Sequence, residues 1–557
     1  MADRYNRRDF MSRGAKFAAG AAILGSGGGL LEACGSSSPS KGSTATTAGS
    51  PGASNLTPKR GGSLTIGTEA EDNGFNPGVA SWDVSGLMYG TTFFDPLVYV
   101  DSNGKWKPFL AQSITPNADY TQWTIKVRPN VVFHDGTPCD ASAIVGSLKA
   151  AKASVQLGFF LQNMSSVGNP DSSTVVITCG EPWYAFPYYL QNGIGSILAP
   201  AMVEAKDGGN THPIGTGPFT FHDWVPNDHA TGTRNTRYWM SNLPYLDQVT
   251  FKPIPDHQAR ENALRAGNID IMHTDDTQTA VDFMHNSSFQ YINDVNNAAT
   301  EHEQDMVMLN CAKPPLDDVR LRQALAYAID RQRIIDTLYN GISPNSNGPF
   351  SKGSPYYTDT GYPSFNLTKA KQLVQQVAKD KGGPISFELS IINDAKDQAV
   401  TTLVQSMFKA AGVNTTLVVV EQSQYIVQAL FGNYAARGWR QFAASDPDEN
   451  YAYWSTKTLA PIGGLSLNIA RNNDPQIQAD LEKGRTSLDT ATRTAAYQDI
   501  AKRFGQDCPF LWINQAYWSV VAKPTVMNFN KGTLPDGSRT LGMTGGFIDP
   551  RFIWVNA

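Results

Sequence analysis

The stretch 306–338 limits the folds open to this chain more than any other part of it. An apolar run at 306–309 predicts a short strand, which a pair of prolines then breaks. Asp317 or Asp318 can cap the helix that follows, because a carboxylate accepts free N–H groups at the positive helix end. Apolar residues then recur at helical spacing and form one face, Leu321, Leu325, Ala328 and Ile329. We expect the chain to leave one lobe here and begin another, with the function in the cleft between them.

Length and charge further narrow the classes of protein to which this chain can belong. A chain of 557 residues is too long for a single core, and its 41% hydrophobic and 17% charged residues are typical of a globular protein. After residue 33 the chain carries 40 basic and 47 acidic side chains, which argues against nucleic acid as the main partner. No stretch after residue 33 is long and apolar enough to span a bilayer.

The first 33 residues are predicted to be an export signal. Arg7 and Arg8 precede a weakly apolar run at 17–31, and this pattern resembles a twin-arginine signal. An ordinary secretory signal containing two arginines is the alternative.

Residues 31–34, Leu-Glu-Ala-Cys, resemble a lipobox. Cleavage before Cys34 would leave its thiol for diacylglyceryl attachment, and two acyl chains anchor a protein stably. A plain cysteine near a non-lipid cleavage site is the alternative. Residues 34–59 are mostly Ser, Thr, Gly, Ala and Pro, and we expect a flexible tether there with a reach of about 25–30 Å.

The rest of the chain mixes strands and helices. The segments 385–392, 399–411 and 415–420 predict a strand, a helix ended by Gly412 and a second strand. This order favours a parallel sheet. The fold class is therefore α/β, combined with α+β parts.

Several motifs together resemble one family. They are Phe-His-Asp-Gly-Thr-Pro at 133–138, Gly-Thr-Gly-Pro-Phe at 215–219, the segments 237–249 and 254–271, and the capped helix of 317–331. In this order they are similar to the extracellular solute-binding proteins of ABC importers, family 5, which includes peptide and nickel binders. The resemblance extends over roughly residues 60–525.

The resemblance implies a two-lobed periplasmic-binding-protein fold of type II, with an extra inserted domain, around a hinge and a cleft. The first lobe would comprise 60–97, 213–309 and 515–557, the inserted domain 98–212, and the second ligand-binding lobe 310–514. The chain would cross between the lobes near Asn310 and Ile513. The implied protein is an extracytoplasmic, lipid-anchored monomer that delivers a peptide or peptide-like solute to an ABC permease.

Four cysteines follow Cys34, and an even number outside the cell suggests disulfides. No two of them form a CxxC pair, so a metal site is not predicted. The resemblance implies the pairing Cys139–Cys179 within the inserted domain and Cys311–Cys508 beside the hinge.

Peptide-binding members of the family hold the ligand's amino group with an aspartate, in a segment that matches 437–448 here. Phe442 or Ala443 occupies that position. A buried ammonium without a carboxylate partner is costly. The ligand group therefore differs, or Asp394 or Asp446 replaces the aspartate.

The predicted ligand-binding residues are Trp82, Tyr89, Trp439, Arg440, Gln441, Phe442 and Asp446. Arg440 would favour an anionic or sugar-like ligand. The two tryptophans either stack on the ligand or belong to the core. Asp446 has two further interpretations, a cap of a helix or turn and, with Asp448, a catalytic carboxylate pair.

The sequence contains no HExxH, GxSxG, Walker or Rossmann motif that predicts an enzyme or a cofactor. We therefore expect a binding protein without covalent chemistry. Three alternatives stay open: a binder of a sugar, an opine or a metal chelate; a hydrolase on the same scaffold; and an envelope regulator that has lost the pocket.

Overall fold

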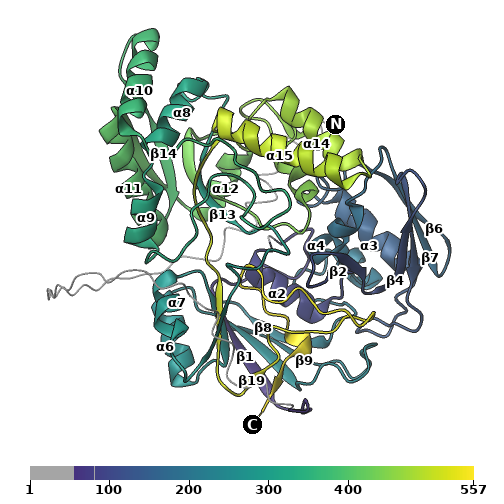
Figure 1. Cartoon of the computed structure of the whole chain (residues 1–557). Helices are drawn as coiled ribbons and strands as arrows, with labels where there is room; N and C mark the ends of the chain where they lie inside the picture. Colours follow the sequence, from purple (N-terminus) through teal and green to yellow (C-terminus); the bar gives the residue numbers. More distant parts are fainter. Residues whose placement is uncertain (1–55, 81, 557) are drawn as a thin grey trace.

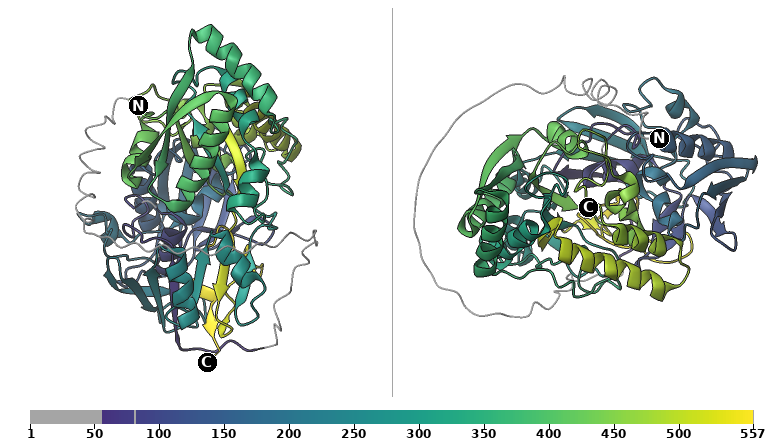
Figure 2. Two further views of the ribbon diagram at one scale, coloured as in Figure 1. Left: turned by 90° about the vertical axis from the view of Figure 1, so that its left-hand side faces the viewer. Right: turned by 90° about the horizontal axis from the view of Figure 1, so that it is seen from above.

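The computed structural model describes residues 56–80 and 82–556. The predicted signal, Cys34 and the tether up to residue 55 lie outside the described residues. Two lobes are stacked on each other, and an inserted domain lies beside them (Figures 1 and 2). Within the described ranges, no helix is long and apolar enough to cross a membrane.

The first lobe is built on a seven-stranded mixed sheet, in the order β12-β18-β11-β1-β10-β9-β8. Its strand β1 (Ser63–Thr68) pairs in parallel with β10 (Gln248–Pro253) on one side and β11 (Ile271–Thr274) on the other. The carboxyl ends of these three strands therefore meet at one edge. The other strands are β8 (Phe219–Val225), β9 (His229–Arg234), β12 (Gln290–Asn293) and β18 (Ser519–Ala522). The lobe also contains α2 (Val84–Phe93), α6 (His257–Ala266), α7 (Thr277–Met284), β19 (Val526–Met527), η5 (Pro550–Phe552) and β20 (Trp554–Val555).

The inserted domain is a small α+β unit, drawn in blue in Figure 1. Its four-stranded antiparallel sheet has the order β4-β5-β7-β6, and α3 (Ala141–Ala153) contributes to its core. Trp123 and Trp183 are among its fully buried side chains. The remaining elements are β2 (Val98–Val100), β3 (Trp106–Pro108), β4 (Ala111–Pro116), β5 (Gln122–Val127), β6 (Met164–Asp171), β7 (Thr174–Cys179), η2 (Phe186–Leu190), α4 (Asn192–Gly195) and α5 (Pro200–Glu204).

The second lobe has a five-stranded sheet in the order β15-β14-β16-β13-β17. Strand β14 (Ile385–Ile392) pairs in parallel with β15 (Val413–Val420) and with β16 (Ala436–Gln441), and α11 (Ala395–Ala411) connects β14 to β15. This confirms the predicted parallel unit. The other elements are β13 (Gln304–Leu309), α8 (Val319–Ala328), α9 (Arg331–Leu338), α10 (Leu367–Lys381), α12 (Gln422–Leu430), η3 (Pro447–Asn450), α13 (Tyr451–Trp454), η4 (Thr456–Thr458), α14 (Pro475–Thr486), α15 (Thr490–Asp507) and β17 (Phe510–Gln515).

The helix that follows the proline pair begins where its sequence predicts. Asp318, rather than Asp317, is the cap, and its side chain accepts a hydrogen bond from the Arg320 backbone N–H at 2.9 Å. Asp317 forms an ion pair with Lys381 instead. The predicted apolar face is buried in the core of the second lobe.

The first crossing between the lobes lies earlier than predicted. Strand β13 pairs with β16 on one side and β17 on the other, so it already belongs to the second lobe. The chain therefore crosses between Asn293 and Gln304, not near Asn310. The apolar run of β13 is explained by its place inside a sheet that helices cover. The return crossing lies between Gln515 and Ser519, just after the predicted Ile513.

The predicted disulfides are not present in the structure, where all four cysteines of the described residues are free. The Cys508 thiol points to the carbonyl of Gly505, and the Cys311 thiol to that of Leu309. Each thiol therefore contacts its own segment. Cys139 and Cys179 are both buried in the inserted domain, and no disulfide joins them.

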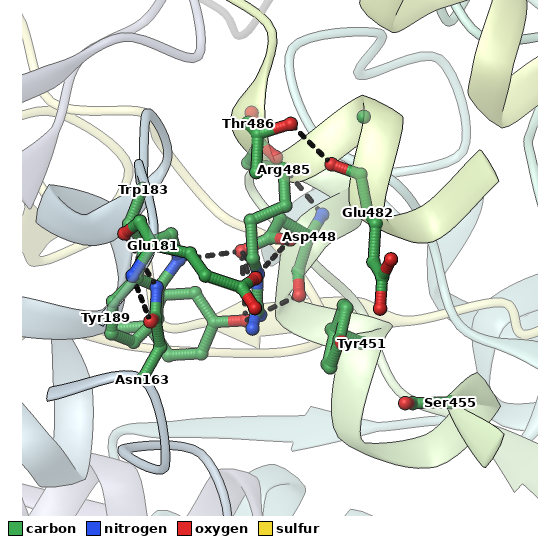
Figure 3. Close-up of polar contacts among 12 residues, drawn as sticks. Asn163, Glu181, Trp183, Tyr189, Asp448, Tyr451, Ser455, Glu482, Arg485 and Thr486 are labelled. Carbon is green, nitrogen blue, oxygen red and sulfur yellow. Dashed lines mark hydrogen bonds and ion pairs between the residues drawn. The ribbon is translucent and has the colours of Figure 1, made fainter. Parts of the chain in front are cut away.

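A buried aspartate joins the inserted domain to the second lobe (Figure 3). Asp448 forms an ion pair with Arg485 at 2.9 Å and accepts a hydrogen bond from the Trp183 indole N–H at 2.8 Å. The Tyr189 hydroxyl also donates to Asp448, and the Arg485 guanidinium lies over the Tyr451 ring. Every group in this cluster is buried and paired, so it holds two domains in one arrangement.

Replacing Asp448 tests this junction. Asp448→Ala leaves the Arg485 guanidinium buried without its partner, and we expect it to destabilise the fold by about 3–5 kcal/mol. The measurement is the urea unfolding midpoint followed by tryptophan fluorescence. Lys502→Ala, which removes an exposed ion pair with Asp499, is the control. Equal midpoints for the two variants would contradict the proposed role of Asp448.

Candidate functional site

A cavity of about 1180 Å³ lies between the two lobes, and the inserted domain forms part of its wall. Both lobes present the carboxyl ends of parallel strands to it. In the first lobe Glu69 follows β1 and Asp275 follows β11, whereas in the second lobe Asp394 follows β14 and Glu421 follows β15. This edge of a parallel sheet is where α/β proteins place their ligands.

Arg440 on β16 is the electrostatic centre of the cleft. Its guanidinium forms ion pairs with Asp305 of β13 at 2.8 Å and with Glu303, just before β13, at 3.3 Å. It also forms an ion pair with Asp275 of the first lobe at 3.0 Å. Lys396 also reaches Asp275, at 3.0 Å. Burial alone would lower the pKa of Arg440, but the carboxylates raise it well above its ordinary value. Both cations are therefore charged and join the lobes across the cleft.

Acidic groups outnumber basic ones on the cavity wall. Eight carboxylates line it, against Lys396 and Arg440. The eight are Glu69, Asp83, Asp275, Asp305, Asp394, Asp397, Glu421 and Glu449. Glu69 and Glu449, whose pKa values are raised to about 8, are largely protonated at pH 7, so at most six of the eight are charged there. Because both cations are already paired, this remaining negative potential is available to a ligand.

Glu69 is a carboxyl of this wall whose pKa is strongly raised, as is that of Glu449. Burial, together with the charges of Asp275 and Asp83, raises the pKa of Glu69 from 4.5 to about 8. Its backbone N–H is held by His273, which stacks on Trp518. A cation close to Glu69 would favour its ionised form and so lower this raised pKa.

Aromatic rings supply the apolar part of the wall. Trp439 stacks on Tyr425 with ring centroids 6.0 Å apart, and both line the cavity. Trp82 packs against α2 and is half-buried, whereas Phe442 is 48% exposed and contacts Tyr453. A large cavity with apolar walls and a few polar anchors is typical of a ligand site.

The structure brings four of the seven predicted binding residues into the cleft: Trp82, Trp439, Arg440 and Phe442. The other three lie elsewhere. Tyr89 is in the core of the first lobe, stacked on Phe251. Gln441 is buried and donates to the carbonyl of Pro349, because the alternation of β16 turns its side chain away from that of Arg440.

Asp446 is a structural residue. It forms a buried ion pair with Arg493 at 2.7 Å and caps η3. It therefore does not replace the missing aspartate, and it forms no catalytic pair with Asp448, which is held by Arg485. Asp394, the other acid named from the sequence, does line the cavity.

Sequence reasoning missed Glu69, Asp275 and Lys396. A signal for two of them was available, since Glu69 and Asp275 each directly follow a short apolar strand. Only the parallel pairing of β1 with β11 shows that the two strand ends are neighbours.

Residues 105–460 match the model of the bacterial extracellular solute-binding proteins, family 5. The chain belongs to this family. This confirms the resemblance drawn from the motifs. The family 5 match and the two-lobed fold around the cavity agree in assigning the cleft to a solute.

Relatives of this family 5 protein differ in what they bind. The chain is 25% identical over 457 residues to the nickel-binding periplasmic protein of Escherichia coli K12, covering 78% of this chain and 86% of that protein. The ABC transporter-associated periplasmic binding protein DppA of Helicobacter pylori, solved with the peptide STSA, has a TM-score of 0.78 at 21% identity, covering 90% and 99% of the two chains. AgaA of Agrobacterium tumefaciens R10, solved with agropinic acid, has a TM-score of 0.77 at 24% identity, covering 89% and 99%. The fold is shared, whereas the two solved structures carry different ligands.

Removing the central cation tests the electrostatics of the cleft. In Arg440→Gln, Asp275 faces Asp305 and Glu303 across the lobes with less compensating charge. We expect the lobes to separate, seen as a larger radius of gyration in small-angle X-ray scattering at low salt. High salt should reduce the difference, because it screens the repulsion. Arg333→Gln on the exposed face of α9 is the matched control. A variant as compact as the wild type at low salt would show that Arg440 does not join the lobes.

Proposed function

We propose that this protein is the solute-binding component of an ABC importer and that it captures a small cationic solute, peptide or peptide-like, in the interlobe cleft. The single observation that carries the choice of ligand is the excess of carboxylates on the cavity wall, eight against two cations. An enclosed negative cavity attracts cations and rejects anions. The closed lobes then present the solute to the permease.

This proposal changes the expected role of Arg440. From the sequence, Arg440 favours an anionic or sugar-like ligand. In the structure three carboxylates already neutralise its guanidinium, so little positive charge is left for an anionic ligand. An opine or a metal chelate fits this wall only if it presents a positive group.

The position of the missing aspartate supports a different anchor for the cation. Phe442 and Ala443 face the cavity where the family's aspartate is expected. Glu69 and Asp394 lie on other walls of the same cavity. The cationic group is therefore held by the carboxyl ends of β1 and β14, not by the loop after β16.

The cavity is large enough for a short peptide. Its volume of about 1180 Å³ exceeds the roughly 300–1,000 Å³ of typical small-molecule pockets. The cleft is neither filled by side chains nor poor in polar groups, so the structure does not favour an envelope regulator that has lost its pocket. The buried ion pairs of Asp446 and Asp448 remove the carboxylate pair on which a hydrolase would depend.

We further propose that Cys34 carries the lipid anchor after export by a twin-arginine signal, and that the protein works as a tethered monomer outside the cell membrane. The lipobox-like residues 31–34 support this.

Cys34→Ala should move the protein from the membrane fraction to the soluble fraction of cells that express the full chain. Arg7→Lys with Arg8→Lys should instead keep it inside the cell. An alanine variant that stays with the membrane would contradict lipidation at Cys34.

A ligand screen tests the choice of solute. Residues 56–557 are purified, unfolded and refolded to remove bound solute, and then screened by thermal shift, because a ligand that binds only the folded state raises the melting temperature. The panel contains cations (lysinamide, Ala-Lys, spermidine), neutral sugars, and anions (agropinic acid, citrate). We expect shifts with cations only. Shifts with the anions alone would overturn the proposal.

Glu69 makes a sharper prediction about pH. A bound cation favours the ionised carboxyl, so binding lowers the raised pKa of Glu69 and releases a proton when the pH is below about 8. The affinity for lysinamide should therefore rise with pH up to about 8, by at most about tenfold per pH unit. Calorimetry in buffers of different ionisation enthalpy measures the proton release.

Glu69→Gln should weaken binding and abolish this pH dependence. Glu388→Gln, an exposed residue of β14 outside the cavity, is the matched control. Proton uptake on binding, or an unchanged pH dependence in Glu69→Gln, would contradict the role of Glu69.

A further inference from the structure

A second cavity of about 430 Å³ adjoins the cleft. The two cavities share wall residues, among them Glu69, Trp82, Arg440 and Phe442. Its volume lies within the range of roughly 300–1,000 Å³ that ligand pockets have. We call this second cavity the side chamber.

The walls of the side chamber come from several parts of the chain and are mainly apolar. The C-terminal segment of the first lobe supplies Phe529, Leu541 and Phe547, and the inserted domain supplies Val98 and Val100 of β2. Trp518, on the return crossing between the lobes, lies against it as well. Charged side chains also line it, among them Glu303, Lys531 and Asp549, so the chamber combines apolar walls with a few polar groups.

One polar group in the side chamber lacks a partner. Thr300, on the first crossing, lines the chamber and is only 6% exposed, yet its hydroxyl forms no hydrogen bond. A buried hydroxyl left unpaired is costly. This group is therefore suited to a ligand atom that accepts or donates one hydrogen bond.

The chamber lies beside the loop in which the family's amino-binding aspartate is missing. Phe442, Ala443 and Ala444 line both cavities, and Ser445 lines the chamber. The loop itself is held firmly, because Glu449 accepts hydrogen bonds from the backbone N–H groups of Ser445 and Asp446 at 2.7 and 2.9 Å. Where a charged anchor is expected, this chain offers an opening with apolar walls.

We infer that the side chamber binds an apolar group of the ligand. The solute is then an amphipathic cation, with its positive group among the carboxylates of the cleft and a bulky alkyl or aryl group beyond Phe442. This rests on the proposed function and deepens it, because it names the second half of the ligand. Removing that apolar group from water provides the affinity that the absent aspartate does not.

A series of lysinamides that differ in one group tests the inference. The probes are lysinamide itself and its Nα-acetyl, Nα-hexanoyl and Nα-phenylacetyl derivatives, which all keep the side-chain ammonium. We expect the dissociation constant, measured by calorimetry, to fall by about tenfold or more from the acetyl to the hexanoyl or phenylacetyl probe. Equal affinities across the acylated probes would contradict the proposed role of the side chamber but not the proposed cation site. No binding by any of the four probes would overturn both.

Variants of the chamber wall test whether the apolar group binds in the chamber or elsewhere in the cleft. Leu541→Trp fills the chamber and should remove the advantage of the hexanoyl probe while affinity for lysinamide stays unchanged. Leu488→Trp, at an exposed position outside both cavities, is the matched control. Phe547→Ala enlarges the chamber and should raise the preference for the phenylacetyl over the acetyl probe. If both wall variants fold and discriminate between the probes as the wild type does, the apolar group binds elsewhere and the inference is wrong.

Discussion

The cluster of Arg440 with three carboxylates is the interaction on which the contact between the two lobes depends. Charges brought out of water are costly unless each meets a partner. Here Asp275 of one lobe and Asp305 of the other approach the same guanidinium, and Lys396 adds a second contact to Asp275. Without these cations, the strand ends of the two lobes would face each other as like charges. The same pairing explains why the cleft, despite its arginine, stays negative toward a ligand.

The loop after β16 matches the family segment except at the amino-binding aspartate, and its chemistry differs accordingly. Asp446 and Asp448 are both used to hold the loop, through Arg493 and Arg485, and Asp448 also binds the inserted domain. With its acids committed to structure, the loop offers Phe442 and Ala443 to the ligand. The rigidity of the loop supports a defined surface on both sides, the charged cleft on one and the apolar side chamber on the other.

Much of the architecture could be predicted from local patterns. The Asp318 cap, the apolar face of α8 and the parallel unit β14–α11–β15 follow from residue spacing and turn chemistry, which act over a few residues. The binding residues were harder to predict. Trp439 and Arg440 could be found because they belong to a family motif. Tyr89 and Gln441 are buried by packing that spacing along the chain does not reveal. The crossing near Asn310 was placed wrongly because β13 is apolar in either lobe, and only its partners show which sheet it joins.

The sequence by itself determined the family, the order of strands and helices, and the absence of the aspartate from the loop at 437–448. These are properties of residues close together in the chain. Only the tertiary structure decided the charge of the cleft and the presence of the side chamber. Glu69, Asp275 and Arg440 are separated by more than a hundred residues from one another. Glu69 and Asp275 meet because β1 and β11 end at a common edge, and Arg440 reaches Asp275 from the facing lobe. The sequence alone does not show whether Arg440 is free to attract an anion or is already neutralised. That depends on which carboxylates lie next to it in the folded protein, because electrostatic interactions depend on distance in space.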